Sequence, residues 1–252
     1  MQSKRNPLHR KFKLRYILAA LMIMIITVLV YRDSGVDHNI TQTANIVPVA
    51  TSSDVVIVST AEVQTSTSSG TTTIVAFGDS ITAGYGLPYG RGYPEQLGQL
   101  LQDRGYQVHM INAGVSGETT AGGLRRVDFI IRQKPDIVIL ALGGNDALRG
   151  IDPKSTSANL AQIIEALKRA HITIILAGMY APENLGPTYV KEFDTIYTSL
   201  SAKYVVTLVP FLLRGVALDP QKNQPDGIHP NEVGAQIIAK DNLLPALLPF
   251  LP

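Results

Sequence analysis

Cysteine, tryptophan and charge are scarce in this sequence, and each shortage excludes a class of protein. The 252 residues include no cysteine and no tryptophan, and only 17% are charged. Without cysteine there is no disulfide framework, no thiol nucleophile, no cysteine-ligated metal and no lipid-bearing cysteine. The fold must therefore be held by a hydrophobic core, for which 45% of the residues are available.

The chain also lacks the basic excess of a nucleic-acid-binding protein. Its formal net charge of +2 comes from 22 Lys and Arg against 20 Asp and Glu. Residues 1–15 contain no acidic residue and six basic ones, namely Lys4, Arg5, Arg10, Lys11, Lys13 and Arg15. Subtracting these six leaves 16 basic against 20 acidic residues, a net charge of −4 for the rest of the chain. We therefore expect no nucleic-acid partner.

Residues 16–32 are interpreted as a signal-anchor transmembrane segment that follows a basic cytoplasmic flank, residues 1–15. The uncharged run 16–31 is shorter than the ~20 residues that span a bilayer, but Arg15 and Arg32 can snorkel, and Tyr16 and Tyr31 suit the interface. No small-residue cleavage site follows directly after the run. We expect a single-pass protein of the cell membrane with an extracytoplasmic catalytic domain. The alternative is a cleaved signal peptide and a secreted or periplasmic product.

Residues 33–71 have the composition of a linker. Fourteen of these 39 residues are Ser or Thr, and none is Lys or Arg. Such a segment buries too little apolar surface to fold alone, and as a flexible coil it spans roughly 30–40 Å. We predict a disordered tether.

Residues 72–252 alternate short apolar runs with helical stretches, which is typical of a single α/β domain with a mostly parallel sheet. The five runs are nearly continuous in apolar character, as in strands covered on both faces. They are 74–77, 108–111, 137–142, 172–176 and 205–209. The prediction is a three-layer α/β/α domain with five strands.

Four apolar stripes at helical spacing separate these runs and are interpreted as core faces. They comprise Leu97, Leu100 and Leu101; Leu124, Val127 and Ile131; Leu160, Ile163, Ile164 and Leu167; and Phe193, Ile196, Tyr197 and Leu200. A last helix is expected to begin at Pro230, because proline suits the first helical position.

Four loops that follow strands carry chemically informative residues. In an open α/β sheet, loops at the carboxyl ends of the strands meet at one edge. The loops are 78–82 (GDSIT), 112–119 (NAGVSGET), 143–146 (GGND) and 226–230 (DGIHP). Together they supply a serine, a histidine, a carboxylate and backbone amides in glycine-containing loops, which are the components of an acyl-transfer site.

Ser80 is the candidate nucleophile, because it follows a strand and precedes a predicted helix, with Gly78 permitting a tight turn. A serine hydroxyl needs a base to remove its proton. Of the three histidines in the domain, His109 and His171 fall within or beside strands, whereas His229 lies in a polar turn. We therefore assign His229 as the base.

Asp226, three residues before His229, is positioned to accept a hydrogen bond from one imidazole nitrogen and leave the other for Ser80. The oxyanion of the tetrahedral intermediate needs fixed donors, each worth about 3–4 kcal/mol. Three are available: the Ser80 N–H, the Gly117 N–H and the side-chain amide of Asn145.

These blocks resemble those of the SGNH, or GDSL, hydrolase family. The block 78–87 (GDSITAGYGL) is similar to its bacterial branch of multifunctional thioesterases, lysophospholipases and arylesterases, and the blocks 181–187 (APENLGP) and 226–231 (DGIHPN) are similar to the arylesterase members. The resemblance covers 72–252 and implies a flavodoxin-like sheet. It also implies Ser80 as nucleophile, His229 and Asp226 as base and orienting residue, and Gly117 and Asn145 in the oxyanion hole. The family members that this chain resembles are soluble, whereas this chain is expected to be tethered.

The expected function is hydrolysis of carboxylic esters, thioesters or lysophospholipids through an acyl-enzyme. Neither a cofactor nor a metal is expected, since the sequence has no Walker lysine and no His-Glu-x-x-His motif. The expected partners are a small ester or lysophospholipid substrate and the membrane, with a monomeric catalytic domain. The alternatives are a carbohydrate or peptidoglycan O-acetylesterase, a tethered binding module without turnover, and a flavodoxin-like nucleotide binder.

Overall fold

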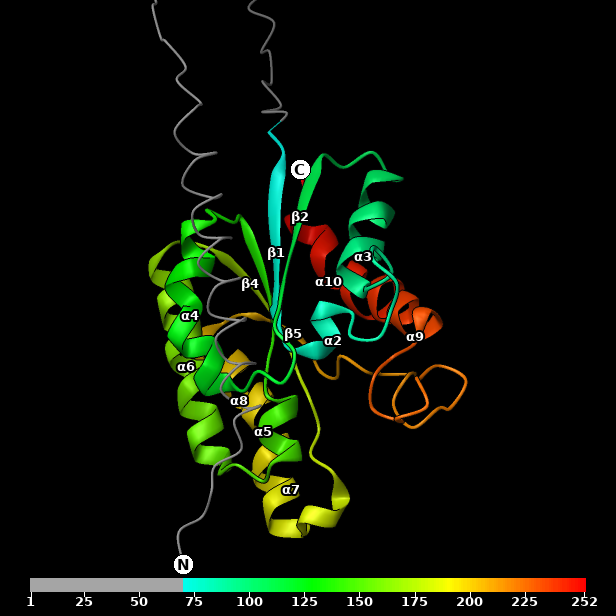
Figure 1. Ribbon diagram of the computed structural model, residues 1–252. Helices are drawn as coiled ribbons and strands as arrows, with labels where there is room; N and C mark the ends of the chain where they lie inside the picture. The colour runs from blue at the N-terminus through cyan, green and yellow to red at the C-terminus, as the bar shows by residue number, and fades with distance from the viewer. Residues whose placement is uncertain (1–69) are drawn as a thin grey trace, which may run out of the picture. The chain divides into compact units, whose positions relative to one another are not determined.

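The computed structural model describes residues 70–252. The predicted basic flank, the transmembrane segment and all but the end of the predicted linker lie outside the described residues. Within 70–252, a five-stranded sheet lies between two layers of helices (Figure 1). The predicted three-layer α/β/α fold is therefore confirmed.

The five strands are all parallel, and their order in the sheet is β2-β1-β3-β4-β5. They are β1 (Thr72–Gly78), β2 (Val108–Gly114), β3 (Ile137–Ala141), β4 (Thr173–Ala177) and β5 (Thr207–Val209). The chain winds outward from β1 to β2 and then returns to place β3 on the other side of β1. Loops diverge at this switch point, where open α/β sheets bind their ligands.

The three inner strands explain the near-continuous apolar runs of the sequence. Every residue of β3 is buried, and β1 and β4 each have only one half-buried position. Both faces of these strands are covered by helices, so polar residues do not alternate with apolar residues along them. The edge strand β2 is more exposed, and it carries polar residues such as His109 and Asn112.

The helices form one layer on each face of the sheet (Figure 1). One layer consists of α4 (Thr120–Arg132), α6 (Pro153–Arg169) and α8 (Ile196–Tyr204). The other consists of α3 (Tyr93–Gln102), α9 (Glu232–Ile237), the π-helical turn η2 (Ile238–Leu243), α10 (Leu244–Leu247) and the 3₁₀ turn η3 (Leu248–Phe250). Four short helices occupy loops after the strands: α2 (Ser80–Ala83), α5 (Gly144–Leu148), η1 (Glu183–Leu185) and α7 (Pro187–Asp194). Among residues 70–252, no helix combines the length and the hydropathy that a membrane span requires.

The structure corrects three local expectations. The stripe from Phe193 to Leu200 is buried as predicted, but Thr195 divides it between α7 and α8. The last strand begins at Thr207 rather than at Val205, because Val205 ends α8 in the left-handed conformation at φ 53°. The C-terminal helical segment begins with α9 at Glu232 and not at Pro230, because the Asn231 side chain caps α9 by accepting from the Gly234 N–H at 3.1 Å.

Candidate active site

The five candidate residues all lie at the carboxyl edge of the sheet. Ser80 is the first residue of α2 after β1, and Asn145 is in α5 directly after β3, on the two sides of the switch point. Gly117 lies in the loop from β2 to α4. Asp226 and His229 lie in the long loop from β5 to α9. Four separate loops therefore supply the site.

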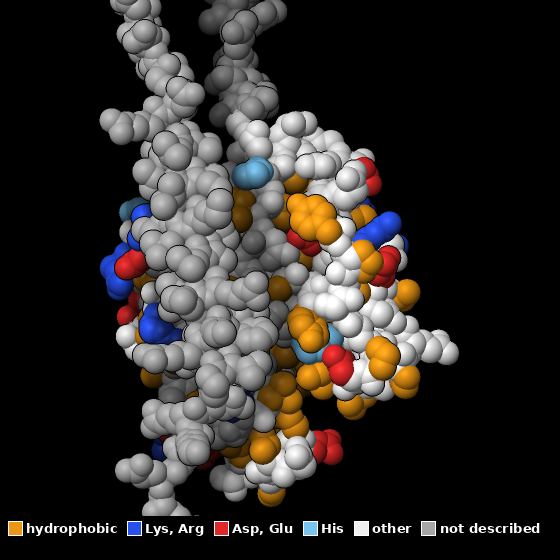
Figure 2. Space-filling model, viewed as in Figure 1, with side chains coloured by type: hydrophobic (Ala, Val, Ile, Leu, Met, Phe, Trp, Pro, Cys, Tyr) orange, Lys and Arg blue, Asp and Glu red, His pale blue; other side chains and the backbone are white. Residues whose placement is uncertain are grey.

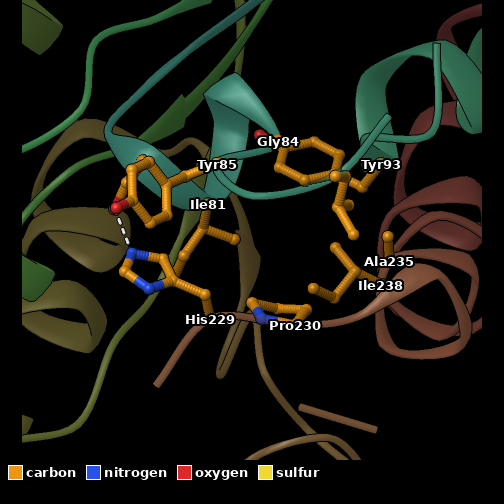
Figure 3. Close-up of a pocket in the computed structure, with 10 residues that line it drawn as sticks. Ile81, Gly84, Tyr85, Tyr93, His229, Pro230, Ala235 and Ile238 are labelled. Carbon is orange, nitrogen blue, oxygen red and sulfur yellow. Dashed lines mark hydrogen bonds between the residues drawn. The ribbon is translucent and has the colours of Figure 1, made fainter. Parts of the chain in front are cut away.

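Ser80, His229 and Asp226 form a continuous chain of hydrogen bonds. The His229 Nε2 atom lies 2.9 Å from the Ser80 Oγ atom, and Figure 3 marks this bond by a dashed line from the imidazole. On the other side of the ring, His229 Nδ1 lies 2.7 Å from Asp226 Oδ2. The histidine is thus held between a hydroxyl and a carboxylate, the arrangement that lets an imidazole accept a serine proton.

The local backbone keeps Asp226 ionised and oriented. Its Oδ1 atom accepts from the backbone N–H groups of Ile228 and His229, each at 3.0 Å, and Gly227 between them adopts φ +76°. The backbone bond from His229, the bond from its imidazole and the bond from Ile228 together lower the pKa of Asp226 to about 2. At neutral pH this carboxylate is therefore an acceptor, which fixes the proton of His229 on Nδ1.

Gln224, a residue that the sequence patterns did not indicate, joins the histidine loop to the serine segment. Its backbone N–H donates to the His229 carbonyl oxygen at 2.7 Å. Its side-chain amide donates to the carbonyl oxygens of Tyr85, at 2.7 Å, and Pro230, at 3.0 Å. Gly86 leaves the space for it, because a Cβ atom there would lie 2.1 Å from Gln224 Oε1. Local sequence patterns could not indicate Gln224, because the Tyr85 carbonyl that its side chain binds is 139 residues away in the sequence.

Gly78 has a different role from the one that the sequence suggested. It ends β1 without adopting a positive φ, and the left-handed residue that ends α2 is Gly84 at φ 69°. A Cβ atom on Gly78 would lie 2.0 Å from Thr82 Oγ1 and 2.7 Å from the Ala141 carbonyl oxygen. The glycine therefore allows α2, and with it Ser80, to pack directly on the ends of β1 and β3.

Two of the three candidate oxyanion donors are held by side-chain hydrogen bonds. Asn145 Nδ2 donates to Asp79 Oδ2 at 3.4 Å, and the Gly117 carbonyl accepts from Arg149 Nη2 at 2.9 Å. Gly117 itself adopts φ +78°. Among the described residues, no acceptor binds the N–H groups of Ser80 and Gly117, so both amides remain able to bind a ligand.

Two buried carboxylates brace the site. Asp79 is 4% exposed, and its Oδ1 atom accepts from the Ile81 N–H at 3.0 Å. Burial raises the pKa of Asp79 to about 6, against the lowering effects of that hydrogen bond and of His229 and Asn145. Asp146 is fully buried and accepts from the N–H and hydroxyl of Thr120 at 2.8 and 2.6 Å. Asp146 therefore ties the start of α4 to α5.

Apolar side chains lie behind the triad and on the surface beside it. Behind Ser80 and His229, a cavity of about 10 Å³, room for one water molecule at most, is lined by Ile81, Leu87, Tyr93 and Ile238 (Figure 3). On the surface, the Tyr85 ring lies 4.7 Å from the His229 ring, and Tyr85, Tyr180 and Ile228 are about half exposed. Figure 2 shows hydrophobic side chains around a surface histidine on this face. The apolar surface beside the triad is thus open, whereas the cavity behind it is too small to hold a substrate.

Residues 70–252 contain no cluster of three or more His, Cys, Asp or Glu side chains suited to a metal ion.

Comparison with known proteins identifies the family. The model of the GDSL-like Lipase/Acylhydrolase family matches residues 76–237, which include all five candidate residues. The chain belongs to this family. The predicted resemblance is confirmed, and so is the predicted enzyme class, a carboxylic ester hydrolase.

Several members of the GDSL-like family are similar over most of their length. Esterase TesA of Pseudomonas aeruginosa is 38% identical over 180 residues, which cover 71% of this chain and 89% of that protein. The protein named thioesterase 1/protease 1/lysophospholipase L1 of Escherichia coli K12 is 37% identical over 168 residues, covering 66% of this chain and 79% of that protein.

Solved structures of similar proteins share the fold. A crystal structure of TesA has a TM-score of 0.67 at 37% identity and covers 70% of this chain and 98% of its own. AlinE4, described as an SGNH-hydrolase family esterase, has a TM-score of 0.61 at 46% identity and covers 71% and 98%. The esterase EstA from Pseudoalteromonas sp., described as inhibited by monoethylphosphonate, has a TM-score of 0.66 at 32% identity and covers 71% and 97%.

Proposed function

We propose that this esterase acts through Ser80 as nucleophile, His229 as general base and acid, and Asp226 as the residue that orients His229. The observation that supports this assignment is the hydrogen-bonded chain from Ser80 Oγ through the imidazole to the Asp226 carboxylate, with distances of 2.9 and 2.7 Å. Each distance lies within the range for proton transfer or orientation by a hydrogen bond.

The reaction has two steps. In the first, Ser80 Oγ attacks the ester carbonyl while His229 Nε2 takes the hydroxyl proton, and His229 then gives this proton to the leaving alcohol or thiol. In the second, water attacks the acyl-enzyme and His229 again transfers the proton, which restores the Ser80 hydroxyl. Asp226 stays ionised throughout, because its pKa of about 2 is far below neutral pH.

The oxyanion of both tetrahedral intermediates is assigned to the Ser80 N–H, the Gly117 N–H and the Asn145 side-chain amide. Within the described residues, the two backbone donors have no other acceptor. Asn145 is oriented by its bond to Asp79. Donors fixed before the reaction stabilise the developing charge without reorganisation, and removing one costs about 10²–10³ in kcat.

The proposed substrates are small to medium acyl esters, thioesters and lysophospholipids. The names of relatives support this breadth, since they include an arylesterase as well as the thioesterase and lysophospholipase of E. coli. The half-exposed Tyr85, Tyr180 and Ile228 supply apolar surface beside the nucleophile. Since the cavity behind Ser80 holds only about 10 Å³, the acyl chain is expected to lie on that surface.

An ester series tests mechanism and substrate together. Initial rates are measured with p-nitrophenyl esters from acetyl to dodecanoyl for the parent, Ser80→Ala and His229→Ala, with Ser116→Ala as a control on a nearby serine. Both triad variants should lose kcat by about 10⁶-fold, as in other serine hydrolases, while the control stays active. Activity that survives Ser80→Ala would refute the nucleophile. An optimum at acetyl would favour the O-acetylesterase alternative.

We also propose that residues 16–32 anchor the enzyme in the cell membrane with the catalytic domain outside the cytoplasm. The support is the apolar run between Arg15 and Arg32 and the six basic residues before it. Fractionation of cells that express a C-terminally tagged chain should place the full-length product in the membrane pellet. A shortened, soluble product would show that the segment is cleaved.

The catalytic domain is proposed to act as a monomer, because one chain supplies Ser80, His229, Asp226 and all three oxyanion donors. Light scattering of residues 72–252 at the concentration of the activity assay should give the mass of one chain. A dimer whose dissociation abolishes activity would contradict this.

A further inference from the structure

Arg126, on α4, contacts three segments near the active site with one side chain. Its Nε atom donates to both carboxylate oxygens of Glu118 at 2.8 Å, and its Nη2 atom also pairs with Glu118. The same Nη2 atom donates to the carbonyl oxygens of Ala113, at 2.8 Å, and Gly78, at 3.2 Å. Its guanidinium lies 4.4 Å from the centroid of the Phe77 ring.

These partners lie on or next to the two backbone segments that carry the Ser80 and Gly117 oxyanion donors. Gly78 ends β1 two residues before Ser80, and Ala113 lies at the end of β2. Glu118 is the residue directly after Gly117. The guanidinium therefore links the nucleophile turn, the end of the neighbouring strand and the loop that presents the Gly117 amide.

We propose that Arg126, through its ion pair with Glu118, is a positioning residue that sets the Gly117 amide relative to Ser80. The inference rests on the proposed function and concerns how its oxyanion hole is held. Arg126 and Glu118 are not expected to touch substrate.

The burial and geometry of the pair favour positioning over a surface role. The Glu118 side chain is 8% exposed and that of Arg126 is 20% exposed, so solvent screens the pair weakly. A guanidinium is a planar fork of donors that can serve a carboxylate and two carbonyl oxygens at once, whereas a lysine ammonium is a point charge on a flexible stem. Arg126→Lys therefore keeps the charge but loses the fixed geometry.

Three variants test the proposal in the full chain: Arg126→Lys, Glu118→Gln and, as a matched control, Arg125→Lys on the adjacent exposed position of α4. For each, kcat and KM for p-nitrophenyl butyrate are expressed per active site, counted by titration with a fluorophosphonate. The Ki of an arylboronic acid, whose serine adduct places an oxygen in the oxyanion hole, is measured alongside.

Arg126→Lys and Glu118→Gln should lower kcat per titrated site about 10- to 100-fold, because small displacements of catalytic groups cost that much. KM should stay within about twofold, and the boronate Ki should rise by the factor by which kcat/KM falls. Arg125→Lys should match the parent. Unchanged kcat and Ki in Arg126→Lys would overturn the proposal, and so would a loss of activity that follows the fraction of titratable sites, which indicates unfolding alone.

A second measurement does not depend on turnover. The ¹H–¹⁵N resonance of the Gly117 amide should shift in Arg126→Lys and Glu118→Gln but not in Arg125→Lys. An unshifted Gly117 resonance would overturn the positioning role even if the activity fell. A parent that shows no Ser80-dependent hydrolysis would instead refute the proposed function, and the Gly117 resonance would still decide the role of Arg126.

Discussion

At the scale of single residues, two aspartates at the site have opposite pKa shifts for physical reasons that the structure makes plain. Asp226 lies in an open turn that supplies two backbone N–H donors and an imidazole, which lower its pKa to about 2. Asp79 is buried, and loss of solvation raises its pKa to about 6. The first residue is therefore a fixed anion, whereas the second changes its charge in the weakly acidic range.

Asp226→Asn should lower kcat strongly with little change in stability. An asparagine can present its N–H₂ group to His229 Nδ1 and thereby stabilise the wrong tautomer, which costs about 10⁴ in kcat in a comparable triad. The Asp226 side chain is 39% exposed, so loss of its ion pair with His229 should have little effect on the melting temperature. Steady-state kinetics and a thermal melt at pH 7.5 test this, and activity within tenfold of the parent would contradict it.

Asp79 should make the free energy of unfolding fall as pH rises from about 4 to 6. Its folded pKa, about 6, is above its unfolded value of 3.8, so the folded state binds the proton more tightly over that interval. The corresponding stability is present below pH 3.8 and is lost as pH rises through 6; it amounts to about 3 kcal/mol. In urea titrations, the difference in stability between parent and Asp79→Asn should change by that order across the interval. A constant difference would disprove the assignment.

At the scale of elements, the sequence predicted the sheet well because its inner strands are buried on both faces. The runs around Ile74, Val138 and Ile174 became β1, β3 and β4 with only small changes at their ends. The structure also brings together Ser80, His229 and Asp226, which the sequence indicated because they lie in short polar blocks, one directly after β1 and one in the loop before α9. The break between α7 and α8 could not be predicted, because the apolar stripe continues on both sides of Thr195.

Two supporting groups at the site could not be predicted because they depend on distant contacts. Gln224 binds a carbonyl 139 residues away, and Arg126 binds Gly78 across 48 residues. Neither Gln224 nor Arg126 belongs to a periodic pattern or a motif in the sequence. Their assignment needs the close packing of loops that only the folded chain provides.

Gly114→Ala should displace α2 and lower both stability and activity. A Cβ atom at Gly114, the last residue of β2, would lie 2.2 Å from the backbone nitrogen of Ala83 and 2.6 Å from its Cα. Because backbone atoms cannot rotate away, relief requires movement of the helix that begins with Ser80, at a cost of about 1–3 kcal/mol. Gly98→Ala in α3 meets only the Met110 side chain and is the control. A fully active Gly114→Ala variant with the parent melting temperature would contradict this account.

At the scale of the whole molecule, the described residues contain a large hydrophobic core and all five candidate site residues. The buried hydrophobic cluster extends from Ile74 to Leu247, and β1 runs from Thr72 toward Ser80, so the start of the domain and the active site lie at opposite ends of that strand. The predicted anchor and linker would therefore join the domain at the end of β1 that is remote from Ser80.

Residues 72–252 alone should fold and keep kcat/KM for soluble esters within about twofold of the full chain, because this segment contains all five candidate site residues and the hydrogen bonds that join the triad. The comparison uses p-nitrophenyl butyrate below micelle-forming concentrations, with detergent-solubilised full-length protein as the reference. A large loss of activity in the isolated domain, with its melting transition intact, would show that residues before 72 contribute to the site.

The most direct test of the central claim is mass spectrometry of the protein after reaction with a monoethylphosphonate ester that carries a good leaving group. The account predicts one phosphonyl group per chain, attached to Ser80, and no adduct in Ser80→Ala. It also predicts at least about a 10²-fold slower reaction in His229→Ala, because the base is absent. An adduct on another residue, or equal labelling of Ser80→Ala, would contradict Ser80 as the nucleophile of this esterase.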